Sequence, residues 1–392
     1  MVNFIKRALE MNLPDRQSAF LWGARKTGKT TYLKEIFPNA NFYDLLKSDV
    51  YLRFLKTPYV FREEVLAHLS LNPQNQTFII DEVQKVPILL DEIHWLIENT
   101  KAQFILCGSS SRKMRQKGVN LLGGRAWKYH FFPLVYHELK EFDLLRALTH
   151  GLIPSHYLSN HPKKFLQAYV EDYIIQEIQA EGLVRNLAAF SRFLEAASYS
   201  NSEMVNYANI ARDCGVDAKT VKGYFEILKD TLISYEIDPY RKRGKRDIIS
   251  SVPKFYFFDP GVANTLAKRQ LTQLQGHDAG KSFENYILHE LMAYKHLNDK
   301  DFSISYWRTK TGLEVDFVIS EADIGIEVKI SKNVKKTELN GLIALMQEQN
   351  MSKSYLVCNE ETPRKVTIDS SYDIWVLPFQ VFLNQLWNGD IL

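Results

Sequence analysis

Residues 21–33, LWGARKTGKTTYL, contain two glycines five positions apart, and the second is followed by Lys29 and Thr30. The segment fits the pattern G-x-x-x-x-G-K-T/S without a gap. An apolar run precedes it and a helix-forming run follows it, which predicts a strand, a loop and a helix N-terminus in succession. Such a junction directs several backbone N–H groups at one point and favours an anion there. The pattern predicts a phosphate-binding loop; the alternative is a glycine-rich turn that binds nothing.

The chemistry of the loop assigns a role to its residues. The Lys29 ammonium is expected to reach the β and γ phosphates of a nucleotide, and the Thr30 hydroxyl to hold Mg²⁺. ATP and Mg²⁺ are therefore the predicted cofactors. The residues expected to contact the nucleotide are Gly23, Ala24, Arg25, Lys26, Thr27, Gly28, Lys29, Thr30 and Thr31.

A second apolar run, TFIIDEVQ, ends in Asp81 and Glu82 about fifty residues after the loop. A nucleotide site of this kind needs a carboxylate that holds Mg²⁺ through water and a neighbouring acid that polarises the attacking water. We expect Asp81 to take the first role and Glu82 the second. Without the loop, the same run would be interpreted as a strand that ends in solvent.

Length, cysteine spacing and apolar runs argue against a single small module, a disulfide framework and a membrane-spanning chain. The 392 residues, 45% of them hydrophobic, predict two to three domains with real cores. A formal charge of only +3 means that any attraction to nucleic acid must come from local patches. The three cysteines have no C-x-x-C pair, and neither a signal peptide nor a membrane-length apolar run is evident. We expect a cytoplasmic protein with no membrane partner.

The pattern of apolar runs divides the chain into four parts. Residues 1–138 alternate strand and helix patterns, which predicts a parallel sheet flanked by helices and an α/β fold class. Residues 139–205 form a helical connector, residues 206–262 form two helices followed by two strands, and residues 276–392 form a further α/β region. The strands expected in the first part are Phe20–Trp22, Ala40–Tyr43, Thr77–Ile80, Phe104–Cys107 and Trp127–Phe132.

The third part is typical of a winged helix. Gly215 supplies a turn between the two predicted helices, and a basic run joins the two strands. The cations of this wing are positioned to neutralise phosphates, or they form a solvated hairpin tip, and winged helices also dock proteins. The cations are Arg241, Lys242, Arg243, Lys245 and Arg246.

A second group of acids lies in the fourth part. Asp316 lies on one predicted strand, and Glu327 and Lys329 lie on the same face of the next. The two acids, completed by Glu284 on the preceding helix, are predicted to hold Mg²⁺ or Mn²⁺, with Lys329 orienting an attacking water. This spacing resembles the core of PD-(D/E)XK nucleases, whose fold is restriction-endonuclease-like. The alternative is a solvated strand face that carries acids and a lysine.

Taken in order, these motifs resemble a family of bacterial and archaeal AAA+ P-loop ATPases with a C-terminal PD-(D/E)XK nuclease-like domain of unknown function. The resemblance covers nearly the whole chain. Pro260 departs from the pattern at a turn, and no lid arginine is found for the nucleotide site. The matching segments are GARKTGKTT, FIIDEVQKVP, ILCGSSSRKM, NLLGGRAWKYHFFPL, VNYANIARDCGVDAKTVKGYFEILKDTLI, KFYFFDPGVA, FENYILHEL, RTKTGLEVDFVI and IGIEVKIS.

The resemblance adds three expectations. Ser110 or its neighbour Ser109 is expected to sense the γ-phosphate, although serine is also a common helix N-cap. Arg125 occupies the place of an arginine finger that acts in a neighbouring subunit, although an arginine at a strand start is more often a surface cation. A homo-oligomer is therefore expected, for which a hexameric ring is one form.

These observations predict a Mg²⁺-dependent ATPase coupled to a nucleic-acid-directed C-terminal region, with DNA favoured over RNA. The alternative is a nucleotide-gated module that binds DNA or protein without cleaving it. A transport or secretion ATPase has no export feature in the sequence to support it.

Overall fold

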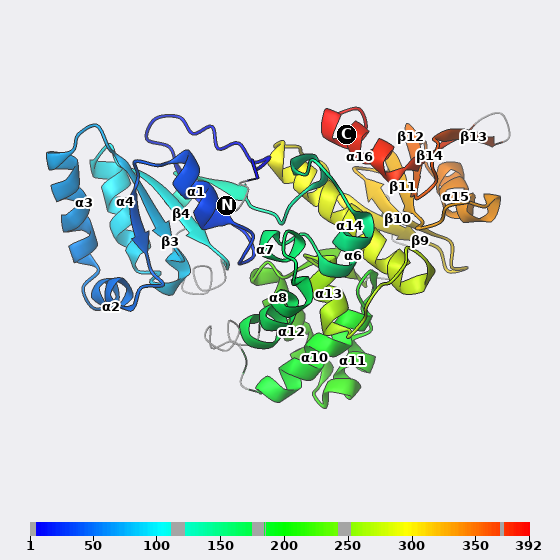
Figure 1. Cartoon of the computed structure of the whole chain (residues 1–392), viewed down its shortest axis with the longest axis horizontal. Coiled ribbons are helices and arrows are strands. Elements are labelled where there is room, and N and C mark those ends of the chain that lie inside the picture. The colour runs from blue at the N-terminus through cyan, green and yellow to red at the C-terminus, as the bar shows by residue number, and fades with distance from the viewer. Residues whose placement is uncertain (1–4, 111–121, 175–183, 185, 242–251, 369–371) are drawn as a thin grey trace. The chain divides into compact units, whose positions relative to one another are not determined.

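The computed structural model describes residues 5–110, 122–174, 184, 186–241, 252–368 and 372–392. The chain divides into two compact units (Figure 1). The first comprises Met1–Leu134 with Asp230–Leu232, and the second comprises Val135–Lys229 with Ile233–Leu392. The three parts predicted at 139–205, 206–262 and 276–392 thus fall almost entirely in the second unit.

The first unit is built on a five-stranded sheet in the order β2-β3-β4-β1-β5. All of its neighbouring strands are parallel. Its β1 and β4 strands are almost fully buried, as their apolar sequences predict, and the α/β fold class is confirmed for this unit. The strands are β1 (Ser18–Trp22), β2 (Asn41–Asp44), β3 (Thr77–Asp81), β4 (Gln103–Gly108) and β5 (Ala126–His130).

Helices connect these strands, and α1 begins directly after the glycine loop. In Figure 1 the neighbouring helices α3 and α4 lie beside the blue and cyan strands. The helices are α1 (Lys29–Ile36), α2 (Ser48–Lys56), α3 (Tyr59–Leu71) and α4 (Leu89–Asn99), with short 3-10 turns η1 (Val83–Lys85) and η2 (Leu122–Gly124).

The strand register brings the loop and the predicted acids to one edge of the sheet. Asp81 on β3 pairs with Cys107 on β4, and Cys107 pairs in turn with Leu21 on β1. Because all three strands run in the same direction, their carboxyl ends meet there. The residues that follow β1 and those that end β3 therefore lie at the same edge of the sheet, on either side of β4.

The second unit begins with helices and a small antiparallel sheet in the order β6-β8-β7. Gly215 ends α11 in the left-handed conformation, φ 69°, as expected for a turn between two helices. Residues 242–251, with four of the five predicted wing cations, lie outside the described residues. The elements are η3 (Tyr136–Glu138), α6 (Leu144–His150), α7 (Pro154–Tyr157), α8 (Pro162–Ala168), η4 (Tyr169–Ile174), α10 (Leu187–Tyr199), β6 (Glu203–Met204), α11 (Tyr207–Cys214), α12 (Ala218–Asp230), β7 (Ser234–Ile237), β8 (Lys254–Phe257) and α13 (Pro260–Leu266).

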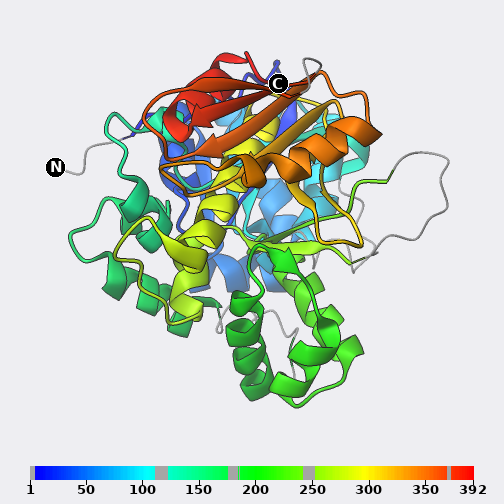
Figure 2. The same ribbon diagram turned by 90° about the vertical axis from the view of Figure 1, so that its right-hand side faces the viewer.

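The same unit ends in a six-stranded mixed sheet in the order β13-β14-β12-β11-β10-β9. Figure 2 shows its orange and red strands, with the long yellow helix α14 running beneath them. None of the helices in the described ranges is both long and apolar enough to cross a membrane. The elements are α14 (Gly276–Leu297), β9 (Ile304–Arg308), β10 (Glu314–Ile319), β11 (Ile324–Val328), η5 (Lys336–Leu339), α15 (Asn340–Glu348), β12 (Lys353–Cys358), β13 (Arg364–Ile368), β14 (Tyr372–Pro378) and α16 (Phe379–Asn388).

Candidate functional site

The loop after β1 depends on its two glycines for different reasons. Gly28 has a φ of 102°, a backbone conformation that would be strained in any residue with a side chain. Gly23 lies against the chain that follows β5, and a Cβ added to it would be 2.3 Å from the Phe131 carbonyl oxygen. The first glycine thus permits close packing of two backbones, and the second permits the turn into α1.

The Lys29 side chain folds back into the loop. Its ammonium donates hydrogen bonds to the carbonyl oxygens of Gly23, at 2.7 Å, and Ala24, at 2.9 Å. Thr27 Oγ1 also donates to the Ala24 oxygen, at 2.7 Å. These bonds close the loop around a buried cation at the N-terminus of α1, which is a favourable place for an anion.

Thr30 and Asp81 meet across β4. The Thr30 hydroxyl donates a 2.7 Å hydrogen bond to Asp81 Oδ2, while Asp81 Oδ1 accepts from the Glu82 amide at 3.1 Å. A hydroxyl and a carboxylate are the hard oxygen donors that Mg²⁺ prefers alongside phosphate oxygens. The residues present fit a magnesium ion, with Thr30 and Asp81 as the groups that would hold it.

Glu82 is held in an unusual backbone conformation, with φ 58° and ψ 43°. A non-glycine residue in this left-handed region costs free energy and is often found at a functional site. Gln84 Nε2 donates to Glu82 Oε2 and, at 3.0 Å, to Ser109 Oγ. Arg25 Nε lies 3.5 Å from Glu82 Oε1. The carboxylate is therefore contacted by Gln84 at one oxygen and by Arg25 at the other.

The remaining loop and sensor residues differ in their exposure. Lys26 and Thr31 are exposed, while Ser109 and Ser110 are both buried at the end of β4. Ser109 Oγ lies 3.4 Å from Glu82 Oε2, which ties this serine to the acid next to the loop. The choice between the two serines as a phosphate sensor stays a prediction.

Two contributors to this site were not predicted from the sequence. Gln84 holds Glu82, and its only signal was its place two residues after that acid. Arg7 donates to the Thr27 carbonyl oxygen at 2.8 Å and to the Phe132 carbonyl oxygen at 2.7 Å, so it connects the loop to the segment after β5. No local pattern marks Arg7, because its partners are distant in sequence.

Arg125 lies immediately before β5, whose first residue pairs with Ser18 at the start of β1. It is therefore at the amino end of the sheet, opposite to the edge that carries Asp81. Its guanidinium pairs with Glu98. This placement gives Arg125 no role at the loop of its own chain, and its predicted action on a neighbouring subunit remains a proposal.

The second predicted group of residues converges within the second unit. The antiparallel register of β10 and β11 pairs Phe317 with Ile326, which puts Asp316 and Glu327 at the next position. Asp316 Oδ2 accepts a 2.9 Å hydrogen bond from the Val328 amide. Lys329 Nζ donates to Glu327 Oε1 at 2.5 Å.

A residue that was not predicted, Lys254 of β8, enters the same cluster. Its ammonium lies 3.0 Å from Glu284 Oε1 and 3.2 Å from Asp316 Oδ1, and it also pairs with Glu314. The Tyr256 hydroxyl donates a 2.6 Å hydrogen bond to Glu284 Oε1. We use the name acid cluster for Glu284, Glu314, Asp316 and Glu327.

The electrostatics of the acid cluster follow from its burial. Desolvation, reinforced by the nearby Asp316 carboxylate, raises the pKa of Glu284 to about 7 and that of Glu327 to about 8. Burial alone would lower the pKa of Lys254, but the carboxylates around it, Glu284 first, raise that pKa well above its usual value. Lys254 is therefore held as a cation.

The fit of the predicted metal ion can be tested against these contacts. Lys254 already bonds to Glu284 Oε1 and Asp316 Oδ1, so a shared ion would compete with it for these two oxygens. Within the described ranges, no group of three or more His, Cys, Asp or Glu side chains is arranged to hold a metal ion. The arrangement thus differs from the expected metal site of Glu284, Asp316 and Glu327, because an ammonium lies among the carboxylates.

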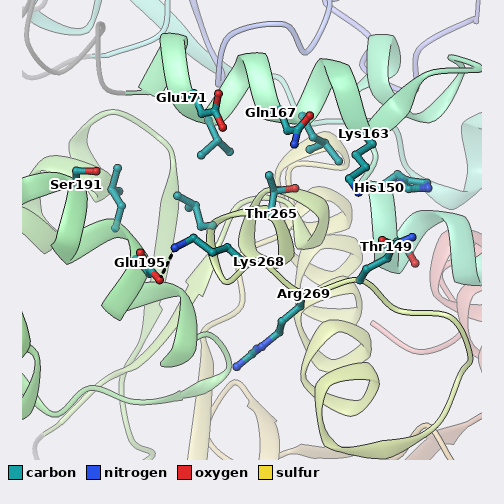
Figure 3. A pocket seen from close by; sticks show the side chains of 15 residues that line it. Thr149, His150, Lys163, Gln167, Glu171, Ser191, Glu195, Thr265, Lys268 and Arg269 are labelled. Atoms are coloured by element: carbon teal, nitrogen blue, oxygen red, sulfur yellow. Dashed lines mark hydrogen bonds and ion pairs between the residues drawn. The ribbon is translucent and has the colours of Figure 1, made fainter.

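A separate cavity of about 490 Å³ lies between helices of the second unit. Figure 3 shows the ion pair between Lys268 and Glu195 on one of its walls, with a 2.9 Å separation. Lys163 and Glu171 add one charge of each sign. No predicted site residue lines this cavity, and its mixed charges select no ligand class.

Comparison with known proteins agrees with the geometry of the first unit. Residues 15–140 match the AAA domain family. This AAA domain contains the glycine loop, Asp81 and Glu82, and it supports a P-loop AAA-type ATPase. Residues 141–273 and 279–381 match two domains of unknown function, DUF8612 and DUF4143.

The relatives are distant. An uncharacterised protein of Mycobacterium tuberculosis is 23% identical over 271 residues, which are 67% of this chain and 60% of that protein. The chain thus spans about 60% of the length of this relative. An uncharacterised protein of Methanocaldococcus jannaschii is 20% identical over 96% of this chain and 90% of its own length. Among solved structures, the Aeropyrum pernix ORC1 protein in complex with DNA covers 64% of this chain and 86% of that chain at 13% identity. The TM-score of this match is 0.29.

Proposed function

We propose that the AAA domain hydrolyses ATP with the help of Mg²⁺. The observation that carries this proposal is the 2.7 Å hydrogen bond between Thr30 and Asp81, next to the loop whose amides surround the N-terminus of α1. This pair joins the phosphate-binding element to a carboxylate on a different strand. A glycine-rich turn without a ligand would not require such a carboxylate.

Each group then has a distinct task. The loop amides and Lys29 bind the β and γ phosphates, and Glu82 accepts a proton from a water molecule as its oxygen attacks the γ-phosphorus. The bond from that phosphorus to the bridging oxygen breaks, which releases ADP and inorganic phosphate. When bound, Mg²⁺ offsets negative charge on the phosphates. Gln84 and Ser109 keep the Glu82 carboxylate in position.

Two substitutions test this assignment. Lys29→Ala removes the cation that faces the phosphates, and we expect hydrolysis to be lost while the circular dichroism spectrum is unchanged. Glu82→Gln keeps the shape of the side chain but cannot accept the proton, so the variant is expected to bind ATP and retain it. Normal turnover in either variant would overturn the role of the residue concerned.

We also propose that hydrolysis is coupled to a nucleic-acid-directed second unit. The support is the helix–turn–helix order of α11 and α12 before the basic run at 241–246. The measurement is ATP turnover with and without double-stranded DNA, single-stranded DNA and RNA, over a series of salt concentrations. Stimulation that weakens as salt rises supports the coupling, and equal turnover in all mixtures contradicts it.

Binding without cleavage is the better supported form of this second role. An ammonium lies among the carboxylates that a nuclease would use for metal ions. A homo-oligomer, with Arg125 acting between subunits, belongs to the same proposal. Incubation of the full chain with DNA and Mn²⁺, with Asp316→Ala as control, tests it: cleavage that is lost in the control would establish a nuclease.

A further inference from the structure

Lys254 is fixed by its backbone. It begins β8, the central strand of the three-stranded sheet, where it pairs with Met204 on one side and Ile237 on the other. The next residues on the strand, Phe255 and Tyr256, are fully buried. The side chain therefore starts from a backbone position that the sheet holds on both sides.

The ammonium of Lys254 is surrounded on several sides. It contacts Glu284 and Asp316, and it pairs with Glu314. The ring centre of Tyr306 lies 5.7 Å from Nζ, within the range of a cation–π contact. Only 2% of the residue is exposed. A cation buried so completely persists only where its charge is compensated, and here the carboxylates compensate it.

The charges in the cluster show what this cation does. The acid cluster has four carboxylates. Lys254 contacts three of them, and Lys329 pairs with the fourth, Glu327. In the described structure, Glu327 Oε2 is buried and has no hydrogen-bond partner. Glu314 also pairs with Arg308, at 2.8 Å, so without Lys254 the carboxylates that lose their close cation are the buried ones of Glu284 and Asp316. Oxygen donors in this state suit a small divalent cation.

We propose that Lys254 is a built-in counter-ion that takes the place of a divalent metal ion in the acid cluster. The natural chain binds no metal ion there, and removal of this one side chain opens a site for Mn²⁺ or Mg²⁺. The inference concerns the second unit alone and stands independently of ATP hydrolysis. It assigns Lys254 the structural task of joining β8 to α14 and β10.

The experiment uses the full chain, freed of metal with a chelator and kept without nucleotide. Mn²⁺ binding is measured by isothermal titration calorimetry in the natural chain, Lys254→Met, Asp316→Asn and the double variant. Methionine keeps the length and apolar character of the lysine stem. We expect Lys254→Met to bind one Mn²⁺ per chain more than the natural chain, and the double variant to lose this additional ion.

Binding at Thr30 and Asp81 is separated by the Asp316→Asn control, which changes only the acid cluster. If the natural chain binds Mn²⁺ and Asp316→Asn abolishes that binding, the proposal is overturned. A folded Lys254→Met chain without additional binding overturns it as well. If Lys254→Met folds only when Mn²⁺ is present, this rescue supports the proposal. If Lys254→Met does not fold at all, the natural chain and Asp316→Asn are compared. Equal Mn²⁺ binding by these two chains supports the proposal, and a difference refutes it.

Discussion

Replacing Thr30 by valine tests the centre of the nucleotide site with a minimal change of shape. Valine keeps the branched side chain and removes the hydroxyl that donates to Asp81 Oδ2 at 2.7 Å. Asp81 is only 4% exposed, so this oxygen would lose its donor in a place that water reaches poorly. Hydrogen bonds to a charged group contribute about 1.5–3 kcal/mol, and we expect a loss of stability of that order.

The assay has two readouts. The midpoint of thermal unfolding should fall by about 3–12 °C, given about 2–4 °C per kcal/mol for a domain of 150–250 residues. The further rise in the midpoint on adding ATP with Mg²⁺ should disappear, because the same hydroxyl is the proposed magnesium ligand. ATP turnover should be lost with it.

Thr30→Ser is the matched control. It removes a methyl group and keeps the hydroxyl, so it should retain the response to ATP and Mg²⁺ and most of the turnover. If Thr30→Val hydrolyses ATP within about twofold of the natural chain, the hydroxyl neither binds Mg²⁺ nor organises Asp81, and the proposed geometry of the site is wrong.

Three further predictions follow from other contacts. Gly23→Ala would place a Cβ 2.3 Å from the Phe131 carbonyl oxygen, so the loop must shift. The affinity for ATP, measured by calorimetry, should therefore fall at least about tenfold. Gly223 has open space around it, so Gly223→Ala should leave the affinity for ATP unchanged. Burial raises the pKa of Glu290 to about 7, so its contribution to stability is complete below its ordinary pKa of 4.5 and is lost as the pH rises through 7. Glu284 and Glu327 add to the same decline, so denaturant titrations should show a decline that is smaller by about 3 kcal/mol in Glu290→Gln than in the natural chain. Arg125→Ala should bind ATP but not hydrolyse it, and mixing this variant with Lys29→Ala chains should restore turnover. Glu98→Ala is the control for loss of the ion pair with Arg125. If Glu98→Ala is active alone and the mixture is inactive, Arg125 does not act between subunits.

The nucleotide site was accessible from the sequence because its parts are local patterns. The glycine spacing fixes a loop, and two apolar runs that end in special residues fix parallel strands. Parallel strands share a carboxyl edge, so the meeting of Thr30 and Asp81 followed from the order of elements. Even the strand boundaries differ by only a few residues, as for Ala40–Tyr43, which is found at Asn41–Asp44.

The acid cluster was predicted only in part, for a reason of distance along the chain. Asp316 and Glu327 share a hairpin register, which the sequence pattern contains. Lys254 precedes Asp316 by 62 positions, and its β8 belongs to a different sheet. Nothing in KFYFFD indicates which carboxylates its lysine will contact, because contacts between sheets are decided by packing. A lysine at the start of an otherwise apolar strand is a weak signal that such a partner exists.

The hydrogen bonds that Lys29 makes within its own loop affect how tightly a nucleotide can be bound. Before it can contact a phosphate, the ammonium must give up its bonds to the Gly23 and Ala24 carbonyl oxygens. If breaking these bonds costs about 1–3 kcal/mol, the measured dissociation constant is about 5–150 times larger than it would be for a loop in which Lys29 makes no such bonds. The two carbonyl oxygens thus compete with a nucleotide for the Lys29 ammonium, and only an anion that attracts this cation more strongly than they do displaces them.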